Sequence, residues 1–230
     1  MADNHNGSTG LGVIIGILTV IFLTSAAVAI LLSGTWLYGI EIDLLNISEI
    51  SGFSREFILD NYRAVIQFLS PFYSGEFLMP DLPASVGGAQ HFEEVKSIVT
   101  GLYIAGIISV FVMAVIALAV NKKIGKRSYL AASVSALALP LAIILGIIID
   151  FDGFFILFHK IFFNNSFWIF YPDTDPVITI LPSEYFMHCA IIIALFWILG
   201  SFLFFLKYKK FKKQNLSKPV SKSNALSFDK

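Results

Sequence analysis

Charged residues and cysteines are both scarce in this 230-residue sequence. Asp, Glu, Lys and Arg make up 14% of the residues, whereas soluble domains carry about 25%. The hydrophobic fraction is 57% and the mean hydropathy is +0.79, so the composition indicates a membrane protein. The lone cysteine, Cys189, excludes an internal disulfide and a thiolate metal cluster.

Several local signatures of catalysis and nucleotide binding are also missing. The sequence contains no GxSxG nucleophile motif and no HExxH metal motif. The glycine-rich GGAQ at 87–90 fits neither a P-loop nor a dinucleotide fingerprint. The basic tail lacks interleaved aromatic residues, so we expect no nucleic-acid partner. We also expect no cofactor and no bound metal.

Long apolar stretches dominate what is present. Four of them contain no Asp, Glu, Lys or Arg and are long enough to cross a bilayer core, which takes about 20 residues. The stretches are Leu11–Ser33, Ser97–Val120, Tyr129–Ile149 and Phe186–Leu206. Because backbone groups in hydrocarbon must satisfy their own hydrogen bonds, each is predicted to be a helix, with a kink at Pro140.

The first apolar stretch has an alternative interpretation as a signal peptide. SAAVA at 25–29 has the small residues of a cleavage site. Two features favour an uncleaved span instead. Residues 1–10 contain no Lys or Arg, and the apolar run continues past the site through residues 30–32.

Lysine and arginine predict the orientation. Four of them lie in residues 121–127 and eight follow from residue 207, whereas residues 34–96 hold three and residues 150–187 hold one. The positive-inside rule then places residues 1–10, 121–128 and 207–230 in the cytoplasm. Segments 34–96 and 150–185 are predicted to lie outside, on the extracytoplasmic side of the membrane. The expected fold is an all-α membrane protein, a four-helix transmembrane bundle with a small extracytoplasmic cap of short helices and extended segments.

The two outer segments have recognisable local patterns. Residues 54–70 show apolar residues at helical spacing after a capping Ser54, which predicts an amphipathic helix. Residues 75–83, with two prolines, are expected to be extended. The β-branched VITIL at 177–181 predicts a short strand or extended clamp.

Two histidines are the candidates for chemistry. His91 and His159 come from different outer segments, so both are expected on one side of the bilayer, where imidazoles titrating near neutrality can move protons. A second interpretation makes them interfacial residues that cap helices or bind headgroups. A third is a metal site formed by both histidines with Glu94.

The charged residues near the two histidines can also be interpreted as part of a site or as structural residues. Lys96 and Lys160 could hold a phosphate or a developing negative charge, or extend toward headgroups. Asp173 and Asp175 could orient an imidazole or serve the turn before Pro176.

Three segments carry a family resemblance. FHKIFFNNSFWIFYPDTDPVITILPSEYF at 158–186 resembles the pattern FHxxFFxNxxWxFxPxTDxLIxxxPxxFF of four-span bacterial membrane proteins that include the lipoprotein intramolecular transacylase family, Lit. HFEEVK at 91–96 is similar to the family's HxxDVK-like block, with Glu94 where Asp is common. NYRAVIQFLS at 61–70 resembles a third, weaker block.

The resemblance implies a reaction and a set of site residues. Such enzymes move the sn-2 acyl chain of a diacylglyceryl-modified lipoprotein to the α-amino group of its N-terminal cysteine, giving the lyso form. His91 and His159 match the two motif histidines and are the expected catalytic pair. We expect His91 as principal base and His159 as acid or oxyanion stabiliser, with the reverse order left open. The supporting candidates are Glu94, Lys96, Trp168 and Asp175.

The implied partners are the lipoprotein substrate and membrane lipids. One competing interpretation is a non-catalytic membrane protein that binds lipid or protein. A transporter is disfavoured, because the four apolar stretches carry no charged residue of the kind that marks a transport path.

Overall fold

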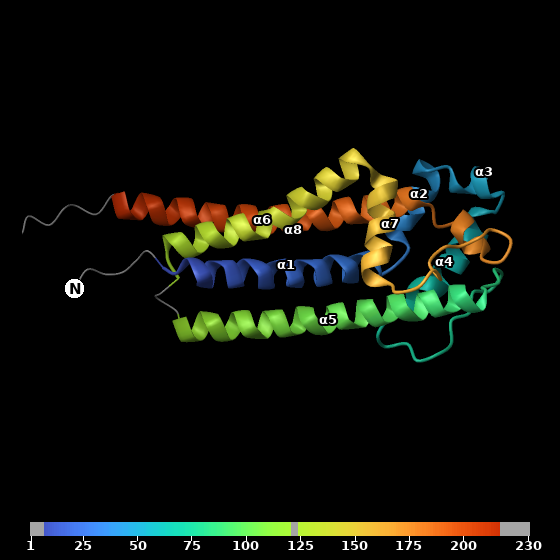
Figure 1. Ribbon diagram of the computed structural model, residues 1–230, viewed down its shortest axis with the longest axis horizontal. Coiled ribbons are helices and arrows are strands. Elements are labelled where there is room, and N and C mark those ends of the chain that lie inside the picture. The colour runs from blue at the N-terminus through green and yellow to red at the C-terminus, as the bar shows by residue number, and fades with distance from the viewer. Residues whose placement is uncertain (1–6, 121–123, 217–230) are drawn as a thin grey trace, which may run out of the picture.

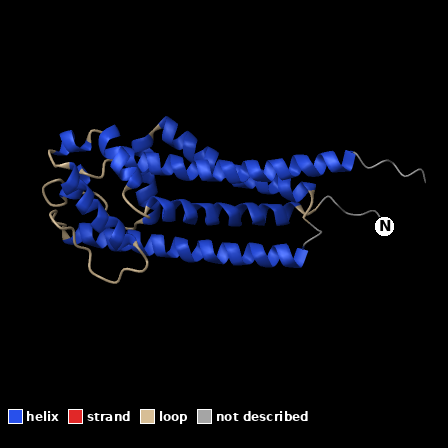
Figure 2. Ribbon diagram, turned by 180° about the vertical axis from the view of Figure 1, so that it is seen from behind, coloured by secondary structure: helices blue, strands red, loops and turns tan. Residues whose placement is uncertain are grey.

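The computed structural model describes residues 7–120 and 124–216, and this part of the chain is helical without a strand (Figures 1 and 2). His5, residues 121–123 of the basic turn and residues 217–230 of the basic tail lie outside the described residues. The elements in chain order are α1 (Thr9–Leu31), α2 (Trp36–Leu44), α3 (Ile47–Ser51), α4 (Arg55–Leu69), α5 (Val86–Val120), α6 (Lys126–Ile149), α7 (Phe151–Phe162), the 3₁₀ helix η1 (Pro176–Thr179) and α8 (Ser183–Leu216).

Four of these helices, α1, α5, α6 and α8, are long and apolar enough to cross a membrane. They run side by side along the long axis of the molecule, and α1 packs against the other three (Figure 1). Large side chains on their outer faces are exposed, among them Ile107, Leu118 and Leu195, as expected of helices surrounded by lipid. The predicted all-α, four-helix membrane fold is confirmed.

Glycine allows α1 and α6 to approach closely. A Cβ on Gly12 would lie 2.3 Å from the Ser128 carbonyl oxygen, and one on Gly16 would lie 2.8 Å from that of Ala132. Glycines four residues apart are the usual means of bringing helix backbones together in lipid, where packing rather than hydrophobicity drives association. This pair therefore sets the spacing between α1 and α6.

Two helices are longer than the apolar stretches that predicted them. α5 begins at Val86 rather than at residue 97, and α8 runs from Ser183 to Leu216 rather than from 186 to 206. At about 1.5 Å per residue, the 35 residues of α5 span about 50 Å, which exceeds a hydrocarbon core of about 30 Å. The polar first turns of α5 therefore continue the helix beyond its apolar part and into the cap.

α6 remains one helix through the buried Pro140 and diverges from α8 in its second half (Figure 1). Directly after it, Asp150 caps α7 by accepting a hydrogen bond from the Gly153 N–H at 2.9 Å. α7 turns back across the bundle toward α5.

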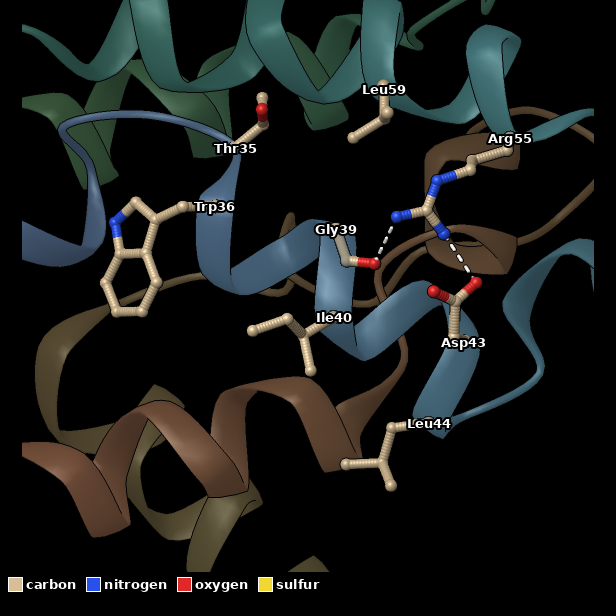
Figure 3. Close-up of a pocket in the computed structure, with 8 residues that line it drawn as sticks. All are labelled: Thr35, Trp36, Gly39, Ile40, Asp43, Leu44, Arg55 and Leu59. Carbon is tan, nitrogen blue, oxygen red and sulfur yellow. Dashed lines mark hydrogen bonds and ion pairs between the residues drawn. The ribbon is translucent and has the colours of Figure 1, made fainter.

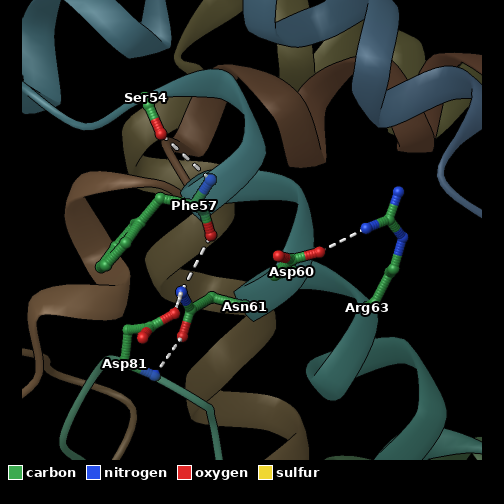
Figure 4. Close-up of polar contacts among 6 residues, drawn as sticks. All are labelled: Ser54, Phe57, Asp60, Asn61, Arg63 and Asp81. Atoms are coloured by element: carbon green, nitrogen blue, oxygen red, sulfur yellow. Dashed lines mark hydrogen bonds and ion pairs between the residues drawn. The ribbon is translucent and has the colours of Figure 1, made fainter.

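The cap gathers at one end of the bundle and contains the main hydrophobic core. Its fully buried members include Tyr38, Ile58, Phe68 and Ile180. The predicted helix at 54–70 forms as α4, with the Ser54 hydroxyl accepting from the Phe57 N–H (Figure 4). The buried Asn61 amide also ties α4 to the following loop through Asp81 (Figure 4).

The strand predicted for 177–181 is wrong. Residues 176–179 form η1, and Val177 and Ile180 are buried in the cap core. A strand needs a neighbour to take its hydrogen bonds, and none exists among the described residues. The β-branched residues are instead explained by packing, which local propensity does not separate from strand formation.

A buried polar cluster fastens the cap to α8. The Glu41 carboxylate on α2 lies 2.8 Å from Nδ1 of His188, with 5% of the glutamate side chain and 27% of the histidine side chain exposed. One turn earlier on α8, the Tyr185 hydroxyl lies 2.7 Å from that of Tyr62 on α4. His188 therefore has a hydrogen-bond partner of its own in Glu41.

We expect His188→Ala to reduce the free energy of unfolding by about 3–5 kcal/mol, because it leaves the Glu41 carboxylate buried without a partner. Adding Glu41→Gln should recover part of the loss, since a neutral amide is cheaper to bury. Thermal unfolding in detergent measures both effects. Glu184→Ala, at an exposed position on the same helix, is the control and should be near neutral. Equal stability of the single and double variants would contradict this role of the pair.

Candidate active site

His91 and His159 meet where α7 crosses the cap end of α5. His91 lies in the second turn of α5 and His159 in the last turn of α7. The two ring centroids are 5.9 Å apart, and both residues are 8% exposed. The two candidates from separate segments therefore share one buried site, before the uncharged stretch 97–120 begins.

Aromatic rings enclose both imidazoles. Phe163 bridges them, with its centroid 4.6 Å from His91 and 5.6 Å from His159. Trp168 stacks on His159 at 4.7 Å, and Phe170 meets His91 edge-on at 5.5 Å. The site is thus apolar apart from the two rings and the groups described below.

The hydrogen bond at Nδ1 fixes the tautomer of neutral His159. Nδ1 lies 2.8 Å from the backbone carbonyl oxygen of Phe155, one turn earlier on α7. Because a carbonyl oxygen can only accept, Nδ1 carries the hydrogen and Nε2 keeps a free lone pair. Burial lowers the pKa of His159, and the bond to Phe155 partly offsets this by favouring the charged form.

The surroundings of His91 differ from those of His159. Burial lowers its pKa, and the neighbouring His159 lowers it further because two cations at this distance repel. Its Nδ1 is buried without a hydrogen-bond partner. Both rings are therefore neutral at pH 7 and able to accept a proton.

Glu94 is joined to His159 through two intermediate residues. Glu94 Oε1 accepts a hydrogen bond of 2.8 Å from the side-chain amide of Asn165. The backbone carbonyl of Asn165 accepts one of 3.0 Å from the Trp168 indole N–H. Trp168 in turn stacks on His159. Glu94 and Trp168 thus belong to the surroundings of the histidine pair.

Asp175 anchors α5 rather than an imidazole. Its Oδ1 accepts from the Ser85 N–H at 2.8 Å and its Oδ2 from the Thr174 hydroxyl at 2.9 Å. The Ser85 hydroxyl in turn accepts from the Gly88 N–H, which caps α5. A Cβ on Gly88 would lie 2.1 Å from Asp175 Oδ1, so glycine is needed for this approach. The carboxylate also favours the positive end of the helix that carries His91.

Lys96 points away from the histidines. Its ammonium donates to the Tyr73 carbonyl at 2.7 Å and lies 4.3 Å from the Phe68 ring centroid. These contacts fix the loop after α4. Lys160 and Asp173 are both exposed.

Two other site types find no support in the geometry. Within residues 7–120 and 124–216, no three His, Cys, Asp or Glu side chains gather closely enough to hold a metal, so the three-ligand alternative does not form. A surface pocket of about 630 Å³ lies between α2 and α4, around the Arg55–Asp43 ion pair (Figure 3). It contains neither histidine.

The fold and this site define a class: a membrane protein of four spanning helices whose cap buries two neutral imidazoles suited to proton transfer. Residues 13–186 match the family described as "Lipoprotein intramolecular transacylase Lit". The chain belongs to this family and is therefore a membrane acyltransferase. Comparison with curated proteins gave no match.

Solved structures agree with the family match. The membrane integral lipoprotein intramolecular transacylase Lit from Bacillus cereus is 33% identical, with a TM-score of 0.82 over 90% of this chain and 97% of that chain. A variant of the Bacillus cereus protein with a histidine replaced by alanine is 32% identical, with a TM-score of 0.77 over 90% of this chain and 94% of the other.

The sequence patterns did not point to the contacts of Phe163 or Asn165. Phe163 is one of several phenylalanines near His159, and composition favoured membrane-interface packing for all of them. Asn165 meets Glu94 across 71 residues of sequence. The asparagine in the family-like pattern at 158–186 was the one available signal.

Asp175→Ala should reduce the free energy of unfolding by about 1–3 kcal/mol, because the Ser85 N–H loses its buried acceptor. Asp173→Ala, two residues earlier and exposed, is the matched control and should change little. Thermal unfolding of both variants in detergent is the measurement. Similar small effects at the two positions would show that Asp175 does not anchor α5.

Proposed function

We propose that this acyltransferase moves the sn-2 acyl chain of a diacylglyceryl-modified lipoprotein to the α-amino group of its N-terminal cysteine, an O-to-N transfer catalysed by His91 and His159. The observation that carries the proposal is the burial of two neutral imidazoles 5.9 Å apart. Nucleophile and ester belong to one molecule, so correct positioning alone supplies an effective molarity of about 10⁵–10⁸ M. Proton transfer by a well-placed pair adds about 10²–10⁴-fold.

The tautomer of His159 favours it as the base. The Nε2 lone pair can take a proton from the attacking amine, and the Nδ1–H bond to the Phe155 carbonyl stabilises the resulting imidazolium. His91 is then the partner that passes a proton to the departing glycerol oxygen. The nitrogen–carbon bond forms as the ester carbon–oxygen bond breaks, without a covalent enzyme intermediate. This reverses the order favoured by sequence alone.

We further propose that the cap faces the extracytoplasmic side of the bacterial plasma membrane and that both termini are cytoplasmic. Four basic residues in 121–127 against one in 150–187 support this orientation. The outward face of α7 is apolar, with Leu157, Phe158 and Ile161 exposed. A lipid-anchored substrate can therefore reach the site from the outer leaflet alongside α7.

Replacing either histidine by alanine should lower formation of the lyso form by about 10²-fold or more, since each removes a proton-transfer group. Lys160→Ala, exposed beside His159, should stay within about twofold of wild type. Mass spectrometry of lipoprotein N-termini, in a host that otherwise leaves diacylglyceryl cysteine with a free amine, reads the product. Persistent free-amine cysteine with the wild-type protein would refute transacylation. Full activity of His159→Ala would remove the base assignment alone.

The acid side of the pH profile should reflect the lowered histidine pKa values. The protonated substrate amine, with a pKa near 8, must lose a proton, so log kcat/KM should rise with slope about one up to that pH. Below the histidine pKa a second proton must be lost and the slope should steepen to about two. Because burial lowers that pKa, we expect the break below pH 6.5. A break at or above 6.5 would contradict neutral, desolvated rings.

A further inference from the structure

Glu94 has one carboxylate oxygen in use and one that is free. Asn165 binds Oε1, whereas Oε2 is buried and has no hydrogen-bond partner. Buried polar atoms in proteins almost always have partners, and a carboxylate oxygen is among the costliest to leave alone. The free oxygen therefore indicates a group that binds there from outside the chain.

The free oxygen belongs to the same site as the histidines. Glu94 follows His91 by three residues on α5, and residues at this spacing share a helix face. Nδ1 of His91 is the other buried polar side-chain atom without a partner among the described residues. The chain of contacts from Glu94 through Asn165 and Trp168 ends on His159. The two unpartnered atoms thus belong to residues one helical turn apart on α5, and contacts connect both residues to His159.

No positive charge of the described protein neutralises Glu94. Within residues 7–120 and 124–216, no Lys, Arg or His forms an ion pair with it. The lysine two residues further along α5, Lys96, donates to the Tyr73 carbonyl instead. Asn165 occupies Oε1 and leaves Oε2 without a donor, so a bound group with N–H donors would supply the missing hydrogen bond.

We propose that Glu94 Oε2 binds the protonated α-amino group of the substrate's N-terminal cysteine and thereby selects lipoproteins with a free N-terminus. This inference rests on the proposed transacylation, whose nucleophile is that amine. A charge-assisted N–H···O bond is about twice as strong as a neutral one, so the ammonium form is recognised over an amide.

The recognition step leads directly into the chemistry. The bound ammonium releases one proton through Nε2 of His159 to solvent, which gives the neutral nucleophile. The amine nitrogen then bonds to the ester carbon, and the carbon–oxygen bond to glycerol breaks. The remaining excess proton on nitrogen moves to the glycerol oxygen through the histidines. No further reactant is consumed, and Glu94 holds the amine beside its proton acceptor throughout.

Binding of unreactive ligands tests the inference separately from turnover. The probes are two dialkyl-ether analogues of a diacylglyceryl-cysteine peptide, one with a free α-amine and one N-acetylated, titrated against the purified full-length protein in detergent at pH 7. Wild type should bind the free-amine ether at least about tenfold more tightly. Glu94→Gln should reduce this ratio to about one without changing the affinity for the acetylated ether.

Two further variants make the result specific. Glu94→Asp keeps the charge and should retain a ratio well above one, whereas Glu93→Gln, at the exposed neighbouring position, should match wild type. A wild-type ratio near one, or an unchanged ratio in Glu94→Gln, would overturn the role of Glu94. Lyso-form production from the ester substrate is measured in parallel. If wild type produces no lyso form, the proposed function is overturned, whatever the ratio of affinities for the two ether analogues.

Discussion

Every backbone hydrogen bond in the hydrocarbon core must be satisfied within its own helix, and the architecture of this protein follows from that requirement. The four apolar stretches have no alternative to helix, so the chain can reverse its direction only beyond their ends. The large hydrophobic core accordingly lies in the cap, as do the buried side chains of Glu41, Asn61 and Asp175. The histidine pair is found there as well, in the turns of α5 that precede its apolar part.

The site depends on joining two segments that are distant in sequence. His91 lies in the part of α5 that extends beyond its apolar stretch into the cap. His159 lies on α7, which runs back across the bundle. Asp175 fastens the segment after α7 to the first residues of α5, and Asn165 repeats this connection at Glu94. These two polar links, with aromatic rings packed between them, hold the imidazoles in place without a metal ligand set among the described residues.

The site combines low polarity with a few directed polar atoms. Burial keeps both imidazoles neutral at pH 7, and the Phe155 carbonyl determines which nitrogen of His159 is basic. An intramolecular transfer needs little more than positioning and a route for protons. A site of this kind is therefore consistent with a family whose substrate brings both the nucleophile and the ester.

Hydropathy predicted the fold, because uncharged stretches of about 20 residues have only one stable form in lipid. The sequence also predicted that His91 and His159 share a side of the membrane, since charge bias in the connecting segments is a local property. It was wrong about residues 177–181, where β-branched side chains fill the core of the cap instead of forming a strand. The tertiary structure alone decided the distance between the histidines, the tautomer of His159, the anchoring role of Asp175 and the free oxygen of Glu94. The histidine distance, the role of Asp175 and the contacts of Glu94 depend on segments that are far apart in sequence, which no local pattern encodes. The tautomer of His159 depends on the helical conformation of α7, which brings Nδ1 to the Phe155 carbonyl one turn earlier.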